Sequence, residues 1–335
     1  MGDLSLGLGL GARSVRSGCR AVRVPYGSFP NVEVEHAAQP TPTSLYTSVT
    51  GVLMQQADPA MKTVVVTGGT DGIGRALAES RLRRGDTVVI LGRDRDKGAA
   101  FLAHARESGV ADRASFIRAD LSLLAENRRV LAVILDAFPV IDALVFCARH
   151  YRSDRAETVE GIEETFAHFY LSRRLLGHGL APALIRAERP VVVNVAGPGA
   201  GLDLVRWDDL QFRSGYHGGA ALGQGGKLND LLGVSSAERY GSTGLRYELI
   251  HPGATRTGLS GQYDQATLRH IEELQRTAKT VQEALVPIVL ALDSPPPRPL
   301  SAFVEGSELD VRTKDFDPSA ARRLHDLTDE FLAAH

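Results

Sequence analysis

One segment constrains the fold of this chain more than any other: a glycine-containing turn between an apolar run and a helix. The apolar run is Lys62–Val66, the turn is Thr67–Gly74, and a helical pattern follows. Glycine permits positive φ and lets a ligand approach the backbone closely. A helix that begins at such a turn presents free N–H groups and a partial positive charge, which suit phosphates. The segment therefore predicts a strand–turn–helix unit that cradles a dinucleotide.

The same alternation of apolar and helical segments continues to the end of the chain. We expect strands at Thr63–Val66, Thr87–Leu91, Ser115–Arg118, Ala143–Phe146, Val191–Val195, Leu245–Ile250 and Ser301–Val304. We expect helices at Ile73–Arg83, Arg95–Ser108, Leu123–Ala137, Gly161–Ala187, Gly226–Tyr240, Ala266–Leu292 and Ala320–Ala333. This order predicts an α/β Rossmann fold: a doubly wound, mainly parallel seven-stranded sheet with helices on both faces, forming one domain over residues 61–335.

The first sixty residues differ from the rest. They contain the alternation Leu6–Gly11, scattered arginines and a Pro/Thr/Ser stretch at Gln39–Thr50, and no helical or strand period persists. We interpret residues 1–60 as a disordered extension. Two readings stay open, a targeting peptide and an extension upstream of a natural start at Met61.

Composition excludes several classes of protein. The formal net charge is −2, so nucleic acid and anionic membranes are poor candidate partners. The two cysteines, Cys19 and Cys147, have no metal-ligand spacing and favour a reducing compartment, so we predict a cytoplasmic protein without a metal site. We find no run of about 18 apolar residues that would suggest a membrane helix.

The end of the second strand indicates which dinucleotide binds. An acidic residue about 20 residues past the glycines usually bonds the ribose 2′-hydroxyl of NAD. Here that place holds Arg93, whose guanidinium suits a 2′-phosphate. We therefore predict NADP(H) in preference to NAD(H). The alternative is a solvated arginine in a charged loop.

Several motifs together resemble the short-chain dehydrogenase/reductase family, nearest its retinol-dehydrogenase-like branch. They are Thr-Gly-x-x-x-Gly-x-Gly at Thr67–Gly74, Asp120-Leu121, Asp142–Val145, Lys227-Leu228, Trp207–Leu210, His251-Pro252-Gly253 followed by Thr257, and Ala321-x-x-Leu324. The resemblance covers essentially all of residues 61–335. It implies cofactor contacts from Thr67, Gly68, Thr70, Asp71, Gly72, Ile73, Gly74, Arg93, Asp120, Leu121, Ala148, Lys227, Pro252, Gly253 and Thr257.

The catalytic positions that the resemblance implies are occupied by other residues. Members of the family carry a Tyr four residues before the Lys, and counting back from Lys227 reaches Gly223, or Leu222 if the alignment shifts by one. The serine place after the fifth strand holds Ala196 and Gly197, and the Asn place falls near Phe169. Of the usual tetrad, only Lys227 is present.

Other residues are candidates to replace the missing groups. Tyr216 and His217 lie in the glycine-rich stretch Gly215–Gly226, where a mobile loop would bring Tyr216 to the nicotinamide beside Lys227. We therefore assign Lys227 and Tyr216 as the catalytic candidates.

Further candidates follow the fourth strand. Arg149, His150 and Tyr151 come directly after it, so we expect them at the substrate pocket. Arg149 would bind an anionic or carbonyl group of the substrate, or turn outward to fill space.

Three functions remain open from these residues. The first is an NADP(H)-dependent oxidoreductase that acts on a carbonyl or alcohol substrate through a non-standard active site. The second is a non-redox enzyme, of dehydratase or cyclase type, on the same fold. The third is a catalytically inactive NADP(H)-binding regulator. A small molecule is the expected partner, and a homo-dimer or homo-tetramer through the long helices is possible.

Overall fold

The apolar segments form the strands of one sheet because their side chains are buried on both faces. The computed structural model describes residues 61–258 and 261–335, and the backbone of residues 34–36. The strand order is β1-β4-β3-β2-β5-β7-β8-β10-β11, and the seven strands from β4 to β10 run parallel. These seven are β2 (Thr63–Thr67), β3 (Thr87–Gly92), β4 (Ala114–Arg118), β5 (Ala143–Phe146), β7 (Val191–Val195), β8 (Arg246–His251) and β10 (Leu300–Val304).

Short antiparallel strands extend both edges of this sheet. At one edge β1 (Val34–His36) pairs with β4, and at the other β11 (Ser307–Glu308) pairs with β10. A separate two-stranded sheet joins β6 (Tyr151–Arg152) to β9 (Gly261–Gln262). Of residues 1–60, the structure describes only Val34–His36, which form β1. The predicted disorder of the others concerns residues outside the described ones.

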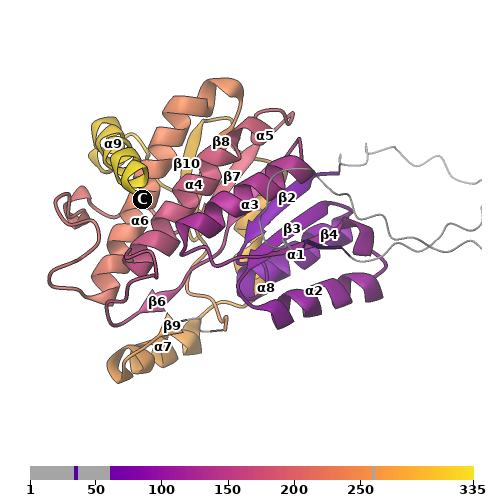
Figure 1. Ribbon diagram of the computed structural model, residues 1–335, viewed down its shortest axis with the longest axis horizontal. Helices are drawn as coiled ribbons and strands as arrows, with labels where there is room; N and C mark the ends of the chain where they lie inside the picture. The colour runs from indigo at the N-terminus through magenta and orange to yellow at the C-terminus, as the bar shows by residue number, and fades with distance from the viewer. Residues whose placement is uncertain (1–33, 37–60, 259–260) are drawn as a thin grey trace, which may run out of the picture. The chain divides into compact units, whose positions relative to one another are not determined.

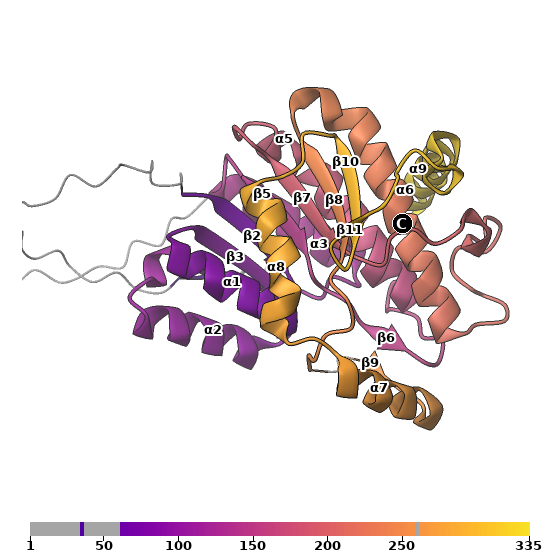
Figure 2. The same cartoon turned by 180° about the vertical axis from the view of Figure 1, so that it is seen from behind.

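Two layers of helices cover the sheet. One face packs on α3 (Leu124–Ala137), α4 (Ser172–Gly179), α5 (Ala181–Leu184), α6 (Gly218–Tyr240) and α9 (Pro318–Ala334), as seen in Figure 1. The other face packs on α1 (Gly72–Arg84), α2 (Arg95–Glu107) and α8 (Val281–Asp293), and Figure 2 shows α8 over the sheet. The predicted doubly wound α/β fold is confirmed.

Three predicted helices have different bounds in the structure. The segment predicted as Gly161–Ala187 starts later, because Gly161 has a φ of 74°, and runs as a π-helix at Phe166–Leu171 followed by α4 and α5. The segment predicted as Ala266–Leu292 divides into α7 (Gln265–Thr277) and α8. Thr280 and Glu283 form a capping box that begins α8, and this signal was present in the sequence.

The third difference concerns the glycine-rich stretch before Lys227. We expected a loop up to Gly226, but α6 begins at Gly218, where the imidazole of His217 accepts a hydrogen bond from the Ala220 N–H at 3.3 Å. Short 3-10 helices occupy Ala111–Arg113, Leu202–Leu204, Gly241–Thr243 and Lys314–Phe316. In the part of the chain that the structure describes, no helix has the length and apolar character to cross a membrane.

Candidate functional site

A cavity of about 760 Å³ opens at the carboxyl ends of the parallel strands. This is the edge at which doubly wound sheets bind their ligands. Its walls come from the turn after β2, the ends of β3, β5, β7 and β8, and the first turns of α6. Residues far apart in the sequence therefore meet around one space.

The glycines of the turn are required by close backbone contacts. Gly68 has a φ of 68°, and a Cβ there would lie 2.8 Å from Cα of Ala148. A Cβ on Gly74 would lie 2.4 Å from the carbonyl oxygen of Gly68. Asp71 caps α1 by accepting a hydrogen bond from the Gly72 N–H at 2.7 Å. The turn and the start of α1 thus form a cradle of the shape that a pyrophosphate needs.

Two cations border the outer end of the cavity. Arg93, predicted from the sequence, lines the cavity and is exposed. Lys97, which the sequence reasoning missed, also lines it and forms an ion pair with Asp71. The hydrogen bond from Lys97 holds the pKa of the Asp71 carboxyl below its usual value. Arg93 directly follows β3 and Lys97 lies in the first turn of α2, so both are near the end of β3.

Most of the predicted cofactor residues line the cavity. They are Gly68, Thr70, Asp71, Gly72, Ile73, Gly74, Arg93, Leu121, Ala148, Pro252, Gly253 and Thr257.

Two predicted cofactor residues, Thr67 and Asp120, do not line the cavity but form hydrogen bonds with neighbouring residues of the chain. The hydroxyl of Thr67 accepts a hydrogen bond from the Ala148 N–H at 3.3 Å. The carboxylate of Asp120 accepts hydrogen bonds from the backbone and hydroxyl of Ser122, which helps to lower its pKa against the opposing effect of burial.

Lys227 does not reach the cavity, and its assignment as a catalytic and cofactor-binding residue is therefore corrected. Its side chain is fully buried and forms an ion pair with Asp230 at 2.8 Å. The ammonium group also donates a hydrogen bond to the carbonyl oxygen of Asp315 at 2.9 Å and lies 5.0 Å from the ring centre of Phe316. Burial raises the pKa of Asp230 to about 6, although Lys227 opposes this shift. Lys227 connects α6 to the 3-10 helix Lys314–Phe316.

The polar partners of Lys227 explain this outcome. The residues of α6 that line the cavity are Gly219, Leu222, Gly223 and Gly226. Lys227 is one position past Gly226 and four past Gly223, so it leaves the helix at the edge of that face, and its ammonium group turns to Asp230 and Asp315. A pair of residues four apart on the cavity face is Leu222 and Gly226. Neither carries a group that can transfer a proton.

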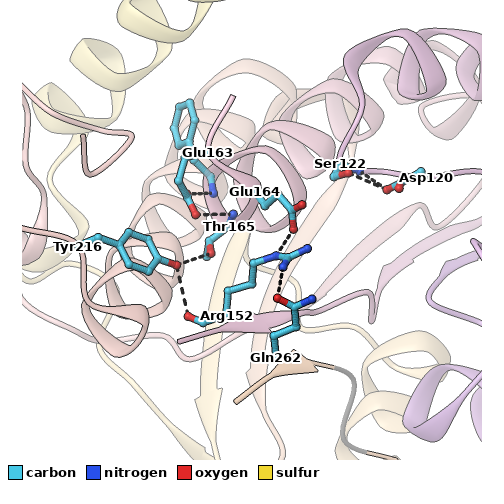
Figure 3. Close-up of polar contacts among 9 residues, drawn as sticks. Asp120, Ser122, Arg152, Glu163, Glu164, Thr165, Tyr216 and Gln262 are labelled. Atoms are coloured by element: carbon cyan, nitrogen blue, oxygen red, sulfur yellow. Dashed lines mark hydrogen bonds and ion pairs between the residues drawn. The ribbon is translucent and has the colours of Figure 1, made fainter. Parts of the chain in front are cut away.

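Tyr216, the other predicted catalytic residue, is also outside the cavity lining. Figure 3 shows its hydroxyl between the hydroxyl of Thr165, at 3.4 Å, and the backbone oxygen of Arg152, at 3.3 Å. Burial raises the pKa of this phenol. In the same view the guanidinium of Arg152 contacts Glu164 and Gln262, which connects the β6–β9 sheet to the segment before the π-helix. Tyr216 therefore anchors a loop.

Of the four predicted substrate-pocket residues, two line the cavity. Arg149 and His150 do so, whereas His217 caps α6 and Tyr151 stacks on Tyr263 with ring centres 5.3 Å apart. Tyr151 thus reaches the cavity wall only through Tyr263, which lines it.

The inner end of the cavity collects polar side chains from three separate segments. Arg149 follows β5, His251 ends β8 and Tyr263 follows β9, and all three line the cavity. Arg149 interacts electrostatically with both others: it opposes the burial that raises the pKa of Tyr263, and it adds to the burial that lowers the pKa of His251. The sequence reasoning did not single out the side chains of His251 and Tyr263.

A buried arginine supports this end from beneath. The guanidinium of Arg173 donates hydrogen bonds to the carbonyl oxygens of Val195, at 3.1 Å, and Ala148, at 2.9 Å, and lies 4.3 Å from the ring centre of Phe169. Burial lowers its pKa to about 10, so it remains a cation. Arg173 therefore joins the ends of β5 and β7.

Two further histidines, His150 and His168, line the cavity. Burial is the main cause that lowers the pKa of His168 to about 3, and it also lowers the pKa of His150. Both ring nitrogens of His150 and Nδ1 of His168 are buried without a hydrogen-bond partner among the described residues. Both rings are therefore neutral at pH 7.

Residues 62–205 match the short chain dehydrogenase family. Human retinol dehydrogenase 14 is 27% identical over 304 residues, covering 83% of this chain and 89% of that protein. A putative daunorubicin C-13 ketoreductase from Streptomyces is 29% identical over 67% of this chain and 77% of its own. The chain belongs to the short-chain dehydrogenase/reductase family. Members of this family are oxidoreductases that bind a nicotinamide cofactor.

Solved structures of other family members share the fold. A short-chain dehydrogenase from Salmonella enterica is 20% identical, with a TM-score of 0.56, and covers 76% of this chain and 100% of its own. A protein from Escherichia coli CFT073, solved with NADPH, is 18% identical with a TM-score of 0.57 over 75% of this chain and 99% of its own. At these identities the likeness concerns the fold.

Proposed function

We propose that this family member is an NADP(H)-dependent oxidoreductase that acts on a carbonyl or alcohol substrate through a non-standard active site. One observation carries the proposal: a sterically intact dinucleotide cradle continues into a space that holds proton-bearing side chains. The glycines at 68 and 74 leave no room for a Cβ. The inner end offers Arg149, His251 and Tyr263 in place of the family's usual groups.

The preference for NADP(H) rests on the charges at the outer end. Arg93 and Lys97 line the same part of the cavity and present two cations. The carboxylate of Asp71 pairs with Lys97 and so offsets one of the two positive charges. A 2′-phosphate would supply the negative charge that offsets the other. The acidic residue that would bond a free ribose hydroxyl is replaced by Arg93.

The inner end supplies the groups for proton transfer. The nicotinamide supplies or accepts a hydride when it is bound. Tyr263 replaces Tyr216 as our candidate proton donor, because its phenol lines the cavity beside Arg149. A neighbouring cation stabilises a phenolate, which is the effect that the family obtains from a lysine. Arg149 also contacts a carbonyl or anionic group of the substrate.

The decisive experiment measures NADPH oxidation with aliphatic and aromatic aldehydes and ketones, together with NADPH and NADH affinity by calorimetry. We expect turnover of at least one carbonyl compound. Arg93→Asp should weaken NADPH binding about 10–100-fold and leave NADH binding unchanged, because it removes a charged contact to the 2′-phosphate. Arg95→Asp is the matched control, since Arg95 is exposed and does not line the cavity. An unchanged preference in Arg93→Asp would refute the role of Arg93.

A second candidate is a catalytically inactive NADP(H)-binding regulator. It is favoured by the cavity face of α6, where Leu222 and Gly226 provide no proton donor. Tight NADPH binding without turnover of any carbonyl compound would support this alternative over the oxidoreductase.

A further inference from the structure

His251 has one ring nitrogen committed to the backbone and the other available to the cavity. Its Nδ1 accepts a hydrogen bond from the Gly253 N–H at 3.2 Å. An accepting nitrogen carries no proton, so the proton of the neutral ring lies on Nε2. No hydrogen-bond partner for Nε2 is found among residues 61–258 and 261–335. The backbone therefore fixes His251 as a donor through Nε2.

The ring lies beside the position where the family's serine is missing. A Cβ built on Gly197 would lie 3.8 Å from Cδ2 of His251, the ring carbon bonded to Nε2. Gly197 and His251 both line the cavity. Because Gly197 has no side chain, the imidazole edge is the polar group next to this part of the wall.

Burial favours the neutral form of His251. It lowers the pKa of the imidazole; Glu305 opposes this effect, and Arg149 and Lys279 add to it. Lys279 and Glu305 form an ion pair with each other at 2.6 Å. A neutral imidazole is a suitable donor to an oxygen that becomes negative, because it polarises the carbonyl without first losing a proton.

We propose that Nε2 of His251 donates the hydrogen bond that holds the substrate oxygen, in place of the absent serine. The assignment rests on the proposed oxidoreductase function. In the reductive direction a bound reduced nicotinamide would supply the hydride that the carbonyl carbon gains, and would itself be oxidised. The π-electron pair of the C=O bond moves to the oxygen, which accepts the proton of Tyr263. His251 keeps its own proton and stabilises the oxygen throughout.

Other polar residues of the cavity fit this role less well. The Cβ of Cys147 lies 3.2 Å from the position of a Cβ on Gly74, so it faces the cradle, and burial raises the pKa of its thiol to about 12. The electrostatic contacts of His150 and His168 place both near Arg93, which borders the outer end of the cavity. His251 is next to the serine place.

Two substitutions separate a catalytic from a structural role. His251→Asn keeps an acceptor near the position of Nδ1 for the Gly253 N–H and removes the distal donor. His251→Gln keeps an N–H group at about the distance of Nε2. His104→Gln, at an exposed position on α2, is the matched control.

We expect His251→Asn to lower kcat about 100-fold, as removal of one oxyanion donor does, with NADPH affinity within about twofold of the wild type. His251→Gln should retain kcat within about tenfold. A kcat in His251→Asn that stays within about threefold of the wild type would overturn the proposal, as would equal losses in Asn and Gln variants.

A second measurement does not depend on turnover. Nitrogen NMR of histidine-labelled protein, assigned with His251→Asn, should show His251 protonated on Nε2 at pH 7.5. Addition of benzaldehyde or acetophenone in the presence of NADP⁺ should shift this resonance. Protonation on Nδ1, or an Nε2 signal that neither compound moves, would refute the inference. Absence of turnover in the wild type with a shifted Nε2 resonance would refute the proposed function alone.

Discussion

The two ends of the cavity differ in the groups that they offer to a ligand: backbone groups at the outer end and side chains at the inner end. The outer end, the cradle formed by Thr67–Gly74, uses backbone N–H groups and the absence of side chains. The inner end needs side chains at chosen positions, and there the family's serine place holds Ala196 and Gly197 and its tyrosine place holds Gly223, or Leu222 if the alignment shifts by one. The cradle carries the family's glycine motif, whereas we propose that residues from other segments serve the inner end.

This difference follows from what each task requires. Backbone binding to a pyrophosphate depends on a few close contacts, and any side chain at Gly74 would collide with the Gly68 carbonyl. Proton transfer and oxygen binding require only a suitable group at the right place, and different segments are able to supply it. In our proposal, Tyr263 after β9 and His251 at the end of β8 provide such groups.

The largest expected effect is a loss of stability on substitution of Lys227, which tests whether this residue has a structural role or binds the cofactor. Lys227→Met leaves Asp230 buried without its partner, so we expect the free energy of unfolding to fall by about 3–5 kcal/mol, measured by urea denaturation. NADPH affinity of the folded fraction should not change. The double variant Lys227→Met/Asp230→Leu should recover most of the stability. A large loss of NADPH affinity with unchanged stability would return Lys227 to the cofactor site.

A substitution in the cradle should affect cofactor binding and stability together. Gly74→Ala places a Cβ 2.4 Å from the Gly68 carbonyl oxygen, so the turn must shift. We expect an unfolding free energy lower by about 1–3 kcal/mol and NADPH affinity at least about tenfold weaker, measured by calorimetry. Gly177→Ala is the control, because its Cβ would meet Phe146 at an ordinary 3.7 Å. Normal NADPH binding by Gly74→Ala would show that the cradle tolerates side chains.

The histidines along the cavity predict a dependence of stability on pH. The pKa of His168 is about 3 in the folded protein, against an ordinary value of 6.5, so below pH 6.5 the unfolded chain binds a proton that the folded protein excludes. Stability therefore falls as pH decreases from 6.5 towards 3. Between pH 7 and 5.5 we expect His168 to account for about 1 kcal/mol of this loss. His168→Gln should reduce the slope, and His104→Gln should leave it as in the wild type.

The smallest effect is expected at Tyr216, and a comparison with Tyr263 distinguishes the two tyrosines. Tyr216→Phe removes weak hydrogen bonds outside the cavity lining, so kcat/KM should change less than about twofold and stability by less than about 1 kcal/mol. Tyr263→Phe should lower kcat about 100-fold or more, because it removes the proposed proton donor. The reverse ranking would restore Tyr216 as the catalytic tyrosine and refute Tyr263.

Local patterns were sufficient to predict the fold and the cradle. The runs Val64–Val66 and Val191–Val193 are apolar at every position, which is typical of parallel strands buried on both faces, and they form the centre of the sheet. The glycine turn was recognisable because its backbone requirement allows very few residue types. Arg93 was found from its spacing, whereas Lys97 was missed because one more lysine at the start of a helix carries no distinct signal.

The location in the cell and the oligomeric state stay predictions. The long helix α6 packs against α9, and Arg174 of α4 pairs with Asp329 of α9 at 2.6 Å. A contact between copies through these helices therefore needs a surface that α9 leaves free.

The sequence by itself determined that this chain folds into a doubly wound sheet with a dinucleotide turn, because both follow from local periodicity and from glycine at fixed places. Only the tertiary structure decided which side chains face the reaction space. Lys227 lies at the edge of the cavity face of α6, and its partner Asp230 draws it into the core, while the approach of distant loops brings Arg149, His251 and Tyr263 together. Such choices depend on helical phase and long-range packing, which no single motif contains.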